Sequence, residues 1–469
     1  MSKAPEEARP LAVLVGVQLP GVTDEQHASD LAELGRLVHT LGYATLATVQ
    51  QKRSSLASGI VLGTGKLKEL AALTGGAGVV GSGAQEKKSK AREKWEAAEE
   101  EEEPGTEEPG AGEEEEPEED ESGISAVPAG AQKPAVVVVN HDLSPSQLSN
   151  LEQATGVGVL DRSGVIVDIF HKHARSREAR LQVEIARLNY LSPRMRTSTG
   201  SRERQQGRGS GDSAIELDRR RIRDRLAELK EGLAAIQADQ EQRRFARRDQ
   251  LRVALVGYTN AGKSSLMRAL TGSEVLVADQ LFATLDTTVR ALHPETRPRV
   301  LVSDTVGFIQ NLPHDLVASF RSTLQEALEA SLLLYVVDAS DPSCDAQLKV
   351  THQVLAEIGA REIPNRLVLN KADRLTPELK ASLLERYPDA LMLSAHSPEE
   401  VRNLRDTLVG FFEASMVEAE LVVPYSRQKL IGEIYENARV VSEAYDEQGS
   451  RLLIRALPAA IAKLQRAFS

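Results

Sequence analysis

A glycine-rich segment that contains a lysine and a serine carries the clearest chemistry in the sequence. It follows the apolar run 251–256 and precedes the helical pattern 265–270. Glycines let backbone N–H groups approach phosphate, a lysine brings positive charge to the β and γ phosphate oxygens, and a serine hydroxyl is a ligand for Mg²⁺. This strand-loop-helix context favours a phosphate-binding loop over a chance glycine turn. The loop residues are Gly257, Tyr258, Thr259, Asn260, Ala261, Gly262, Lys263, Ser264 and Ser265.

A carboxylate motif, Asp304-Thr305-Val306-Gly307, follows a second apolar run at 300–303. Its carboxylate can hold Mg²⁺ through water, and the N–H of Gly307 can sense a γ-phosphate. Ser264 and, through water, Asp304 are therefore expected to be ligands of Mg²⁺.

In nucleotide-hydrolysing domains that carry these two motifs, the interval between them supplies a threonine ligand to Mg²⁺. Thr284 is preferred to Thr287 and Thr288, and this ordering rests on motif resemblance, not on geometry. The expected switch residues are Phe282, Ala283, Thr284, Leu285 and Asp286.

Two later motifs indicate which base is bound. Asn370-Lys371-Ala372-Asp373 follows the apolar residues 367–369, and the Asp373 carboxylate can accept both the N1 and the N2 protons of guanine. Adenine has neither donor there, so GTP is favoured over ATP. Ser394-Ala395-His396 follows 392–393 and can offer a backbone N–H to the guanine O6. One tetrapeptide can arise by chance, but all of them in order after apolar runs indicate a GTPase domain.

The sequence does not supply an obvious catalytic residue. Phe308 and Ile309 stand where many small GTPases carry the glutamine that positions water, so we expect slow intrinsic hydrolysis. A partner, a cation or ordering of residues 284–288 would then complete the site. Asn260 resembles the asparagine with which potassium-activated GTPases hold K⁺, and a loop-stabilising asparagine is the equal alternative.

Composition sets limits on the kind of protein. The chain has 469 residues, 41% of them hydrophobic, which is enough for about three domains with cores. Cys344 is the only cysteine, so an intrachain disulfide and a cysteine-based zinc site are excluded. The apolar runs are far shorter than the roughly 20 residues of a transmembrane helix, and residues 1–10 have no signal-peptide pattern. We expect a cytoplasmic protein, a monomer, with no stable membrane insertion.

The net charge of −12 conceals two blocks of opposite sign. Residues 93–122 contain 17 acidic residues and one lysine, a local charge of −16, so the rest of the chain sums to +4. Residues 171–250 contain 20 basic and 12 acidic residues, a local charge of +8. The acidic block is read either as a solvated segment or as an interaction element that occupies the basic one and weakens nonspecific RNA binding.

The apolar patterns predict an α/β protein with four parts. We expect an N-terminal α/β domain at 1–170, interrupted at 85–133 by a disordered acidic insert, and a basic arm of two antiparallel helices at 171–250. A P-loop GTPase domain at 251–412, with a mostly parallel sheet covered by helices on both faces, would follow. A small αβ domain at 421–469 would close the chain.

The motifs together resemble the HflX family of ribosome-associated GTPases. The phosphate loop, Leu281-Phe-Ala-Thr-Leu-Asp286 and the residues 304–317 carry the likeness, and 142–147, 161–165 and 169–184 extend it over nearly the whole chain. This chain departs from the family pattern Asp-Pro-Thr-Thr-Arg at 286–290.

The resemblance implies a protein that binds the large ribosomal subunit in its GTP state and splits or recycles stalled ribosomes. Ribosomal RNA would attract the basic arm, with Arg208 and 219–221 as phosphate-contact candidates, and solvated arginines on a helix are the alternative.

Two other functions stay open from the sequence. One is a GTP-gated regulatory module that acts on a protein partner without splitting ribosomes. The other is an RNA-remodelling enzyme with a second nucleotide site in the N-terminal domain, for which Gly63-Thr-Gly-Lys66 is a short signal. Mg²⁺ is the expected cofactor, GTP and GDP the expected ligands, and a requirement for K⁺ is left open.

Overall fold

The computed structural model describes residues 9–56, 59, 61–80, 133–194, 211–245, 250–273, 281–282, 287–310, 326–426, 431–445 and 449–468. Contacts divide the chain into two compact units, Met1–Arg162 and Ser163–Ser469. Among the described helices, none combines the length and the apolar composition that a membrane span needs. The acidic insert expected at 85–133 lies outside the described residues except for Lys133.

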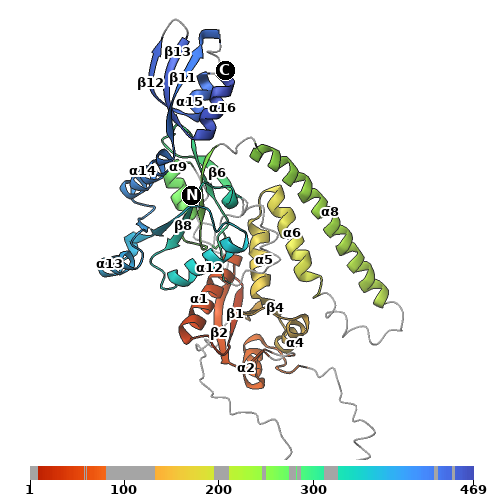
Figure 1. Ribbon diagram of the computed structural model, residues 1–469. Coiled ribbons are helices and arrows are strands. Elements are labelled where there is room, and N and C mark those ends of the chain that lie inside the picture. The colour runs from red at the N-terminus through yellow and green to blue at the C-terminus, as the bar shows by residue number, and fades with distance from the viewer. Residues whose placement is uncertain are drawn as a thin grey trace, which may run out of the picture. The chain divides into compact units, whose positions relative to one another are not determined.

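A four-stranded parallel sheet in the order β2-β1-β3-β4 is the centre of the first unit (Figure 1). All four valines of β3 are buried, because helices cover both faces of a parallel sheet of this kind. The α/β character expected for this part of the chain is confirmed. The elements are β1 (Leu11–Gln18), α1 (Asp24–Leu41), β2 (Ala44–Lys52), α2 (Thr64–Thr74), β3 (Val136–Val139), α4 (Pro145–Thr155) and β4 (Gly158–Asp161).

Local signals in the sequence set the ends of these helices. Ser144 caps α4 and forms a capping box with Gln147, and α1 begins with the same arrangement at Thr23. Helix α1 ends at Gly42, whose φ of +112° is the left-handed conformation that glycine adopts without a side-chain clash. Both ends therefore follow from residues that lie within a few positions of them in the sequence.

Three helices lead from the unit boundary toward the second sheet: α5 (Arg162–His173), α6 (Arg177–Leu191) and α8 (Gly211–Phe245). Helices α6 and α8 lie side by side and run antiparallel, as the apolar spacing predicts (Figure 1). Leu229 of α8 is buried, and Ile222, Leu226, Leu233 and Ile236 of the same helix are half-buried. Residues 195–210, between α6 and α8, lie outside the described residues.

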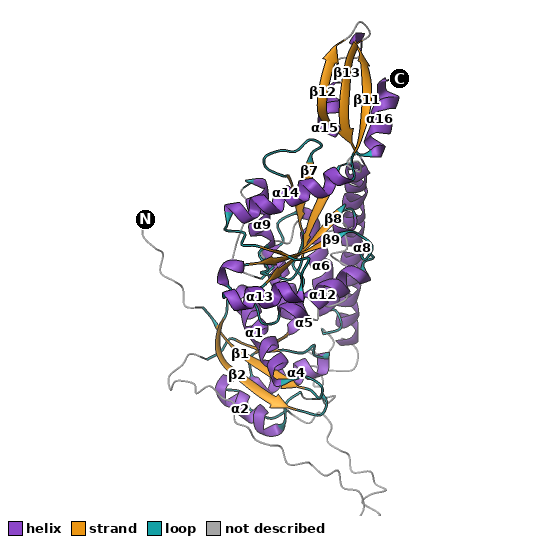
Figure 2. Ribbon diagram, turned by 60° about the vertical axis from the view of Figure 1, so that its left-hand side comes forward, coloured by secondary structure: helices purple, strands orange, loops and turns teal. Residues whose placement is uncertain are grey.

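The second sheet has six strands in the order β10-β9-β8-β5-β7-β6, all parallel except the edge strand β6 (Figure 2). Helices cover both of its faces: Leu334 of β8 packs in the core that contains α9 and α14, and Tyr335 stacks on His352 of α12. Strand β6 was not expected. The elements are β5 (Leu251–Val256), α9 (Lys263–Thr271), β6 (Thr288–Ala291), β7 (Val300–Asp304), β8 (Leu332–Asp338), α12 (Cys344–Glu357), β9 (Asn365–Asn370), α13 (Pro377–Arg386), β10 (Leu391–Met392) and α14 (Pro398–Ala414).

A three-stranded antiparallel sheet in the order β11-β13-β12 follows, with two helices on one face. Ile434 and Leu464, one from each helix, are buried in its core. The first strand begins at Val417, four residues before the predicted αβ domain. The elements are β11 (Val417–Pro424), α15 (Ile431–Asn437), β12 (Arg439–Tyr445), β13 (Gly449–Ala456) and α16 (Pro458–Phe468).

Candidate nucleotide-binding site

The predicted phosphate loop joins the buried strand β5 to helix α9, so its backbone N–H groups lie at the N-terminus of that helix. Gly257 has a φ of +149°, and a Cβ there would lie 2.1 Å from the carbonyl oxygen of Val336. Gly262 has a φ of +89°, and its Cβ would lie 2.3 Å from Nδ2 of Asn370. Only glycine fits these two positions, which explains the spacing of the motif.

Asn260 lies in the middle of the phosphate loop and has a φ of +61°. Asparagine tolerates this left-handed conformation better than most residues. Its side chain is exposed. The backbone geometry therefore supplies a structural reason for asparagine at this position.

Lys263 is the first residue of α9 and is 6% exposed. Its ammonium donates hydrogen bonds to the carbonyl oxygens of Gly257 at 3.0 Å and Tyr258 at 2.8 Å. Burial lowers the pKa of Lys263 to about 8, against the opposing effect of the Asp304 carboxylate. The charge is thus held at the inner side of the loop, where the sequence places the β and γ phosphates.

Two of the three predicted metal ligands, Ser264 and Asp304, are in direct contact. Ser264 Oγ donates a hydrogen bond of 2.6 Å to Oδ2 of Asp304, whose side chain is fully buried at the end of β7. A hydroxyl and a carboxylate oxygen beside a phosphate loop are hard ligands of the kind that Mg²⁺ prefers. The residues present therefore fit a magnesium ion.

The segment after β7 lies against the phosphate loop. Thr259 N–H donates to the carbonyl of Phe308 at 2.8 Å, and Phe308 N–H donates to the carbonyl of Gly257 at 3.1 Å. A Cβ on Gly307 would lie 2.8 Å from Cα of Thr259 and 3.1 Å from Nζ of Lys263. Glycine at 307 is thus required for the close approach of the two segments.

The side chains at 308 and 309 offer no hydrogen bond to a water molecule. Phe308 is 2% exposed and Ile309 is 1% exposed, so both serve packing. Tyr258, which was predicted only as a loop residue, accepts a hydrogen bond of 2.8 Å at its hydroxyl from the N–H of Gln310. It ties the loop to the segment beyond Phe308.

The expected switch segment is described only in part. Leu281 and Phe282 are buried, and Phe282 has a φ of +58°. Residues 283–286, which include the chosen threonine Thr284, lie outside the described residues.

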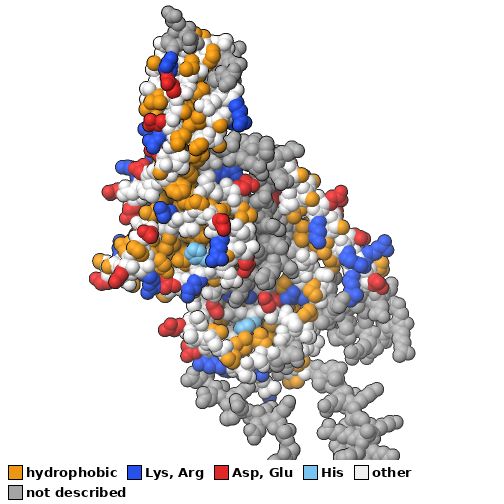
Figure 3. Space-filling model, viewed as in Figure 1, with side chains coloured by type: hydrophobic (Ala, Val, Ile, Leu, Met, Phe, Trp, Pro, Cys, Tyr) orange, Lys and Arg blue, Asp and Glu red, His pale blue; other side chains and the backbone are white. Residues whose placement is uncertain are grey.

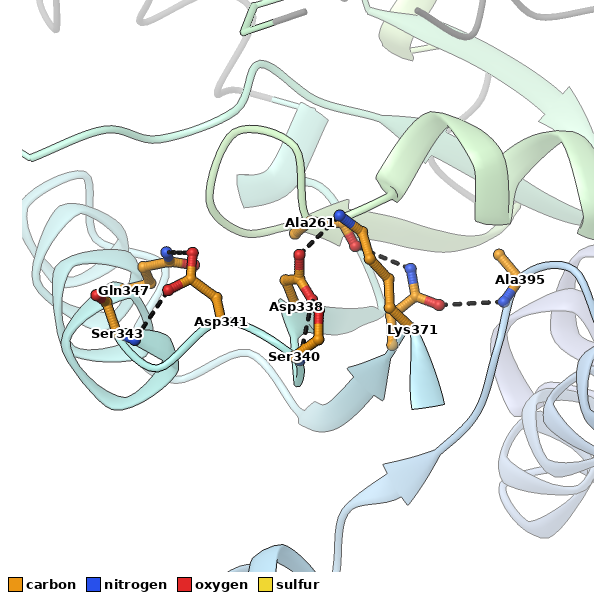
Figure 4. A network of polar contacts seen from close by, with 9 residues as sticks. Ala261, Asp338, Ser340, Asp341, Ser343, Gln347, Lys371 and Ala395 are labelled. Atoms are coloured by element: carbon orange, nitrogen blue, oxygen red, sulfur yellow. Dashed lines mark hydrogen bonds and ion pairs between the residues drawn. The ribbon is translucent and has the colours of Figure 1, made fainter. Parts of the chain in front are cut away.

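Asn370 connects the loops at both ends of the predicted site (Figure 4). Its Nδ2 donates to the carbonyl oxygen of Ala261 at 2.8 Å, and its Oδ1 accepts from the N–H of Ala395 at 3.1 Å. One buried side chain therefore sets the spacing between the phosphate loop and the loop after β10.

Lys371 follows with a φ of +62° and forms an ion pair of 2.7 Å with Asp338. Asp338 is held in turn by Ser340, whose hydroxyl donates to it at 2.6 Å (Figure 4). Sequence reasoning missed Asp338, although its position at the end of the apolar run 332–337 was a usable signal: the carboxyl ends of parallel strands share one edge of a sheet.

Asp373 and Ser394 meet at the predicted base site. The carboxyl of Asp373 is exposed, and a hydrogen bond from the side chain of Ser394 holds its pKa below the usual value. Ser394 N–H donates to Oε2 of Glu400 at 2.6 Å, and Ser394 Oγ accepts from the N–H of His396 at 3.2 Å. Glu400 was not predicted from the sequence, because it reads as an ordinary acidic residue in the first turn of α14.

We expect Ser394→Ala to raise the pKa of Asp373. The ionised carboxylate loses the donor that stabilises it, so the acid form persists to higher pH. Titration of the carboxyl carbon by NMR measures this. Glu378, whose pKa is lowered by its own backbone N–H and by Thr376, is the internal reference and should not move. An unchanged Asp373 titration would contradict the assigned hydrogen bond.

Comparison with known proteins places the whole chain in one family. A family model described as GTP-binding GTPase N-terminal matches residues 28–80 and 124–171, one described as GTP-binding GTPase middle region matches 173–247, and one described as 50S ribosome-binding GTPase matches 252–371. The GTPase HflX of Gluconacetobacter diazotrophicus is 64% identical over 460 residues, which is 98% of each chain. The GTPase HflX of Escherichia coli K12 is 40% identical over 67% of this chain and 76% of its own length.

Among solved structures, a complex of SsGBP with GDP aligns with 86% of this chain and 98% of its own, at 21% identity and a TM-score of 0.44. The near-complete likeness to the Gluconacetobacter protein and the three consecutive family models confirm the family that the motifs suggested, and with it GTP binding. The chain belongs to the HflX family of GTPases, and it hydrolyses GTP.

Proposed function

We propose that this GTPase associates with the large ribosomal subunit in its GTP state, splits or recycles stalled ribosomes, and leaves after hydrolysis. The observation that carries the proposal is a run of exposed arginines on α8, in the same compact unit as the nucleotide site. Family membership supports it, because the model that matches 252–371 is described as a 50S ribosome-binding GTPase.

These arginines belong to the N-terminal half of α8, where basic side chains gather (Figure 3). Arg219, Arg220, Arg221 and Arg223 are exposed there. Arg221 pairs with Asp218 at 3.1 Å on the same helix, a surface contact of small energy that an RNA phosphate can replace. Within the described residues, no carboxylate lies within 4.0 Å of Arg219 or Arg223.

The proposal includes four domains, at 1–170, 171–250, 251–412 and 421–469. The loops of the third domain that are described above would hold the nucleotide. The phosphate loop would receive the phosphates on its N–H groups and on Lys263. Asp373 would accept from the guanine N1 and N2 protons, while the N–H of His396 would donate to O6 in place of its bond to Ser394 Oγ. Ser264 and Asp304, with Thr284, would hold Mg²⁺, which neutralises charge on the phosphates.

A group other than the side chains of residues 308 and 309 would complete the catalytic site, because both of these side chains are buried and apolar. We propose that ribosome binding supplies or orders the missing group. Two activators are possible, the ribosome and a monovalent cation held by Asn260. Comparing the rate of GTP hydrolysis in K⁺ with the rate in Na⁺ tells them apart.

Sedimentation tests the ribosome proposal. The full chain with a non-hydrolysable GTP analogue is expected to travel with the large subunit and to reduce the amount of intact ribosomes, and with GDP it should remain at the top of the gradient. A chain that stays free of ribosomes in every nucleotide state would contradict the proposal, and would leave a GTP-gated regulator of a protein partner as the better function.

Paired charge variants separate a specific surface from net charge. The double variant Arg219→Ser, Arg223→Ser should weaken ribosome association by about tenfold at physiological salt. The slope of log affinity against log salt concentration should become shallower by the amount expected for about two phosphate contacts. The control carries Arg361→Ser and Arg402→Ser, which remove the same charge from exposed positions of the GTPase region. Equal loss in both variants would show that α8 is not the contact surface.

A further inference from the structure

An aromatic contact joins the switch region to a helix outside the predicted GTPase domain. Phe282 lies at the start of the expected switch segment, and Phe170 lies in α5. Their ring centroids are 4.5 Å apart with an interplanar angle of 63°, an edge-to-face arrangement. Phe170 is fully buried and Phe282 is 2% exposed. The contact is therefore part of a packed core.

The backbone of Phe282 is in a conformation that a bulky residue rarely adopts. Its φ of +58° lies in the left-handed region, where a side chain approaches the backbone closely. Such a residue persists only where its surroundings hold it in place. Burial of the ring against Phe170 is the surrounding contact that the structure shows.

Phe170 is connected to the basic helical arm by a short path. The carbonyl of Phe170 accepts the N–H of Ala174 at 2.9 Å, and the carbonyl of Ala174 accepts from Nε of Arg180 at 3.4 Å in α6. Ser176 caps the start of α6 through the N–H of Ala179. Helix α6 then packs along α8. Because the ring of Phe170 contacts the ring of Phe282, a shift of α5 would change the position of Phe282.

We propose that Phe170 is a positioning residue for GTP hydrolysis: by seating the ring of Phe282, it holds the left-handed turn from which the switch segment departs. It acts through Phe282 and contacts no nucleotide. The proposal rests on the GTPase activity and on the assignment of the switch segment, and is independent of ribosome binding. It makes turnover depend on a residue of α5, which leads into the helical arm.

Single-turnover GTP hydrolysis by the isolated full chain tests this. Phe170→Leu and Phe170→Ala are expected to lower the hydrolysis rate by about threefold and tenfold or more, since a displacement of about 1 Å near the reacting groups can cost up to about 10²-fold and these side chains leave different parts of the contact in place. Both should raise the Mg²⁺ concentration that gives half the maximal rate. GDP affinity should stay within twofold, because the phosphate loop and the base loops are not altered.

Two further variants separate positioning from packing. Phe412→Leu is the matched control: Phe412 is 3% exposed and packs edge-to-face with Phe411 at 5.2 Å in the core beneath α14. It should lower the melting temperature as much as Phe170→Leu without changing the Mg²⁺ requirement. Phe282→Gly restores the left-handed backbone without the ring, and should retain more activity than Phe282→Ala.

The proposal is overturned if Phe170→Leu and Phe412→Leu change the rate and the Mg²⁺ requirement alike, or if Phe170→Ala hydrolyses GTP at the unaltered rate. Loss of GDP affinity in step with the rate would also overturn it, since the contact would then support the whole nucleotide site. These assays contain no ribosome. A negative result for Phe170 therefore does not bear on the ribosome proposal, and a negative result for ribosome binding does not bear on the role of Phe170.

Discussion

Asp373→Asn is expected to lower GTP affinity by about 10²- to 10⁴-fold and to shift the preference toward xanthosine triphosphate. The carboxylate can accept two charge-assisted hydrogen bonds from guanine, each worth roughly 1.5–3 kcal/mol. An asparagine amide instead turns an N–H₂ group toward a donor. Xanthine has a carbonyl where guanine has its amino group, so it matches the substituted side chain.

Competition between labelled GTP and unlabelled nucleotides measures both effects. Asp389→Asn is the matched control, because it removes the same charge from an exposed position after α13 and should leave GTP affinity unchanged. Restored binding of the xanthosine nucleotide also shows that the Asp373 variant is folded. Equal GTP binding by that variant and the natural chain would refute the base assignment.

Gly307→Ala is expected to reduce GTP hydrolysis by at least about 10²-fold while leaving GDP bound. The added methyl would lie 2.8 Å from both Cα and Cγ2 of Thr259, so the segment after β7 must move away from the phosphate loop. Displacements of this kind near the reacting groups cost orders of magnitude in rate. GDP, which has no γ-phosphate, makes less use of the N–H at this position.

Gly410→Ala provides the comparison for this substitution. Gly410 lies within α14, and a Cβ there would meet nothing within 4 Å. Alanine should stabilise the helix by about 0.5–1 kcal/mol and leave turnover unchanged. The rate is measured by phosphate release and GDP affinity by fluorescence titration. Normal turnover by Gly307→Ala would show that the two segments can separate without loss of function.

Sequence patterns predicted the elements that local chemistry determines. The apolar runs at 251–256 and 300–303 appear as buried strands, and the glycine positions of the phosphate loop are explained by a left-handed φ and close backbone contacts. Chain order also placed the Asn370 and Ser394 motifs correctly at strand ends. These features depend on a few neighbouring residues, so a linear pattern can show them.

Contacts between distant residues were not predictable in the same way. Strand β6 is short and half exposed, so its pairing with β7 is set by the sheet edge, not by its own residues. Glu400 and Asp338 are ordinary acidic residues in the sequence, and their partners are Ser394 and Lys371. The edge contact between Phe170 and Phe282 joins segments more than a hundred residues apart, and nothing in either segment indicates the other.

The tie made by Asn370 has a consequence for nucleotide exchange. Its bonds to Ala261 and Ala395 join protein atoms only, so we expect the spacing of the phosphate and base loops to be the same with GTP, with GDP and without nucleotide. A pre-organised cradle of this kind pays little ordering entropy on binding. GDP release then requires no unfolding of the loops, and the loaded nucleotide should follow the GTP to GDP ratio of the surroundings without a dedicated exchange factor.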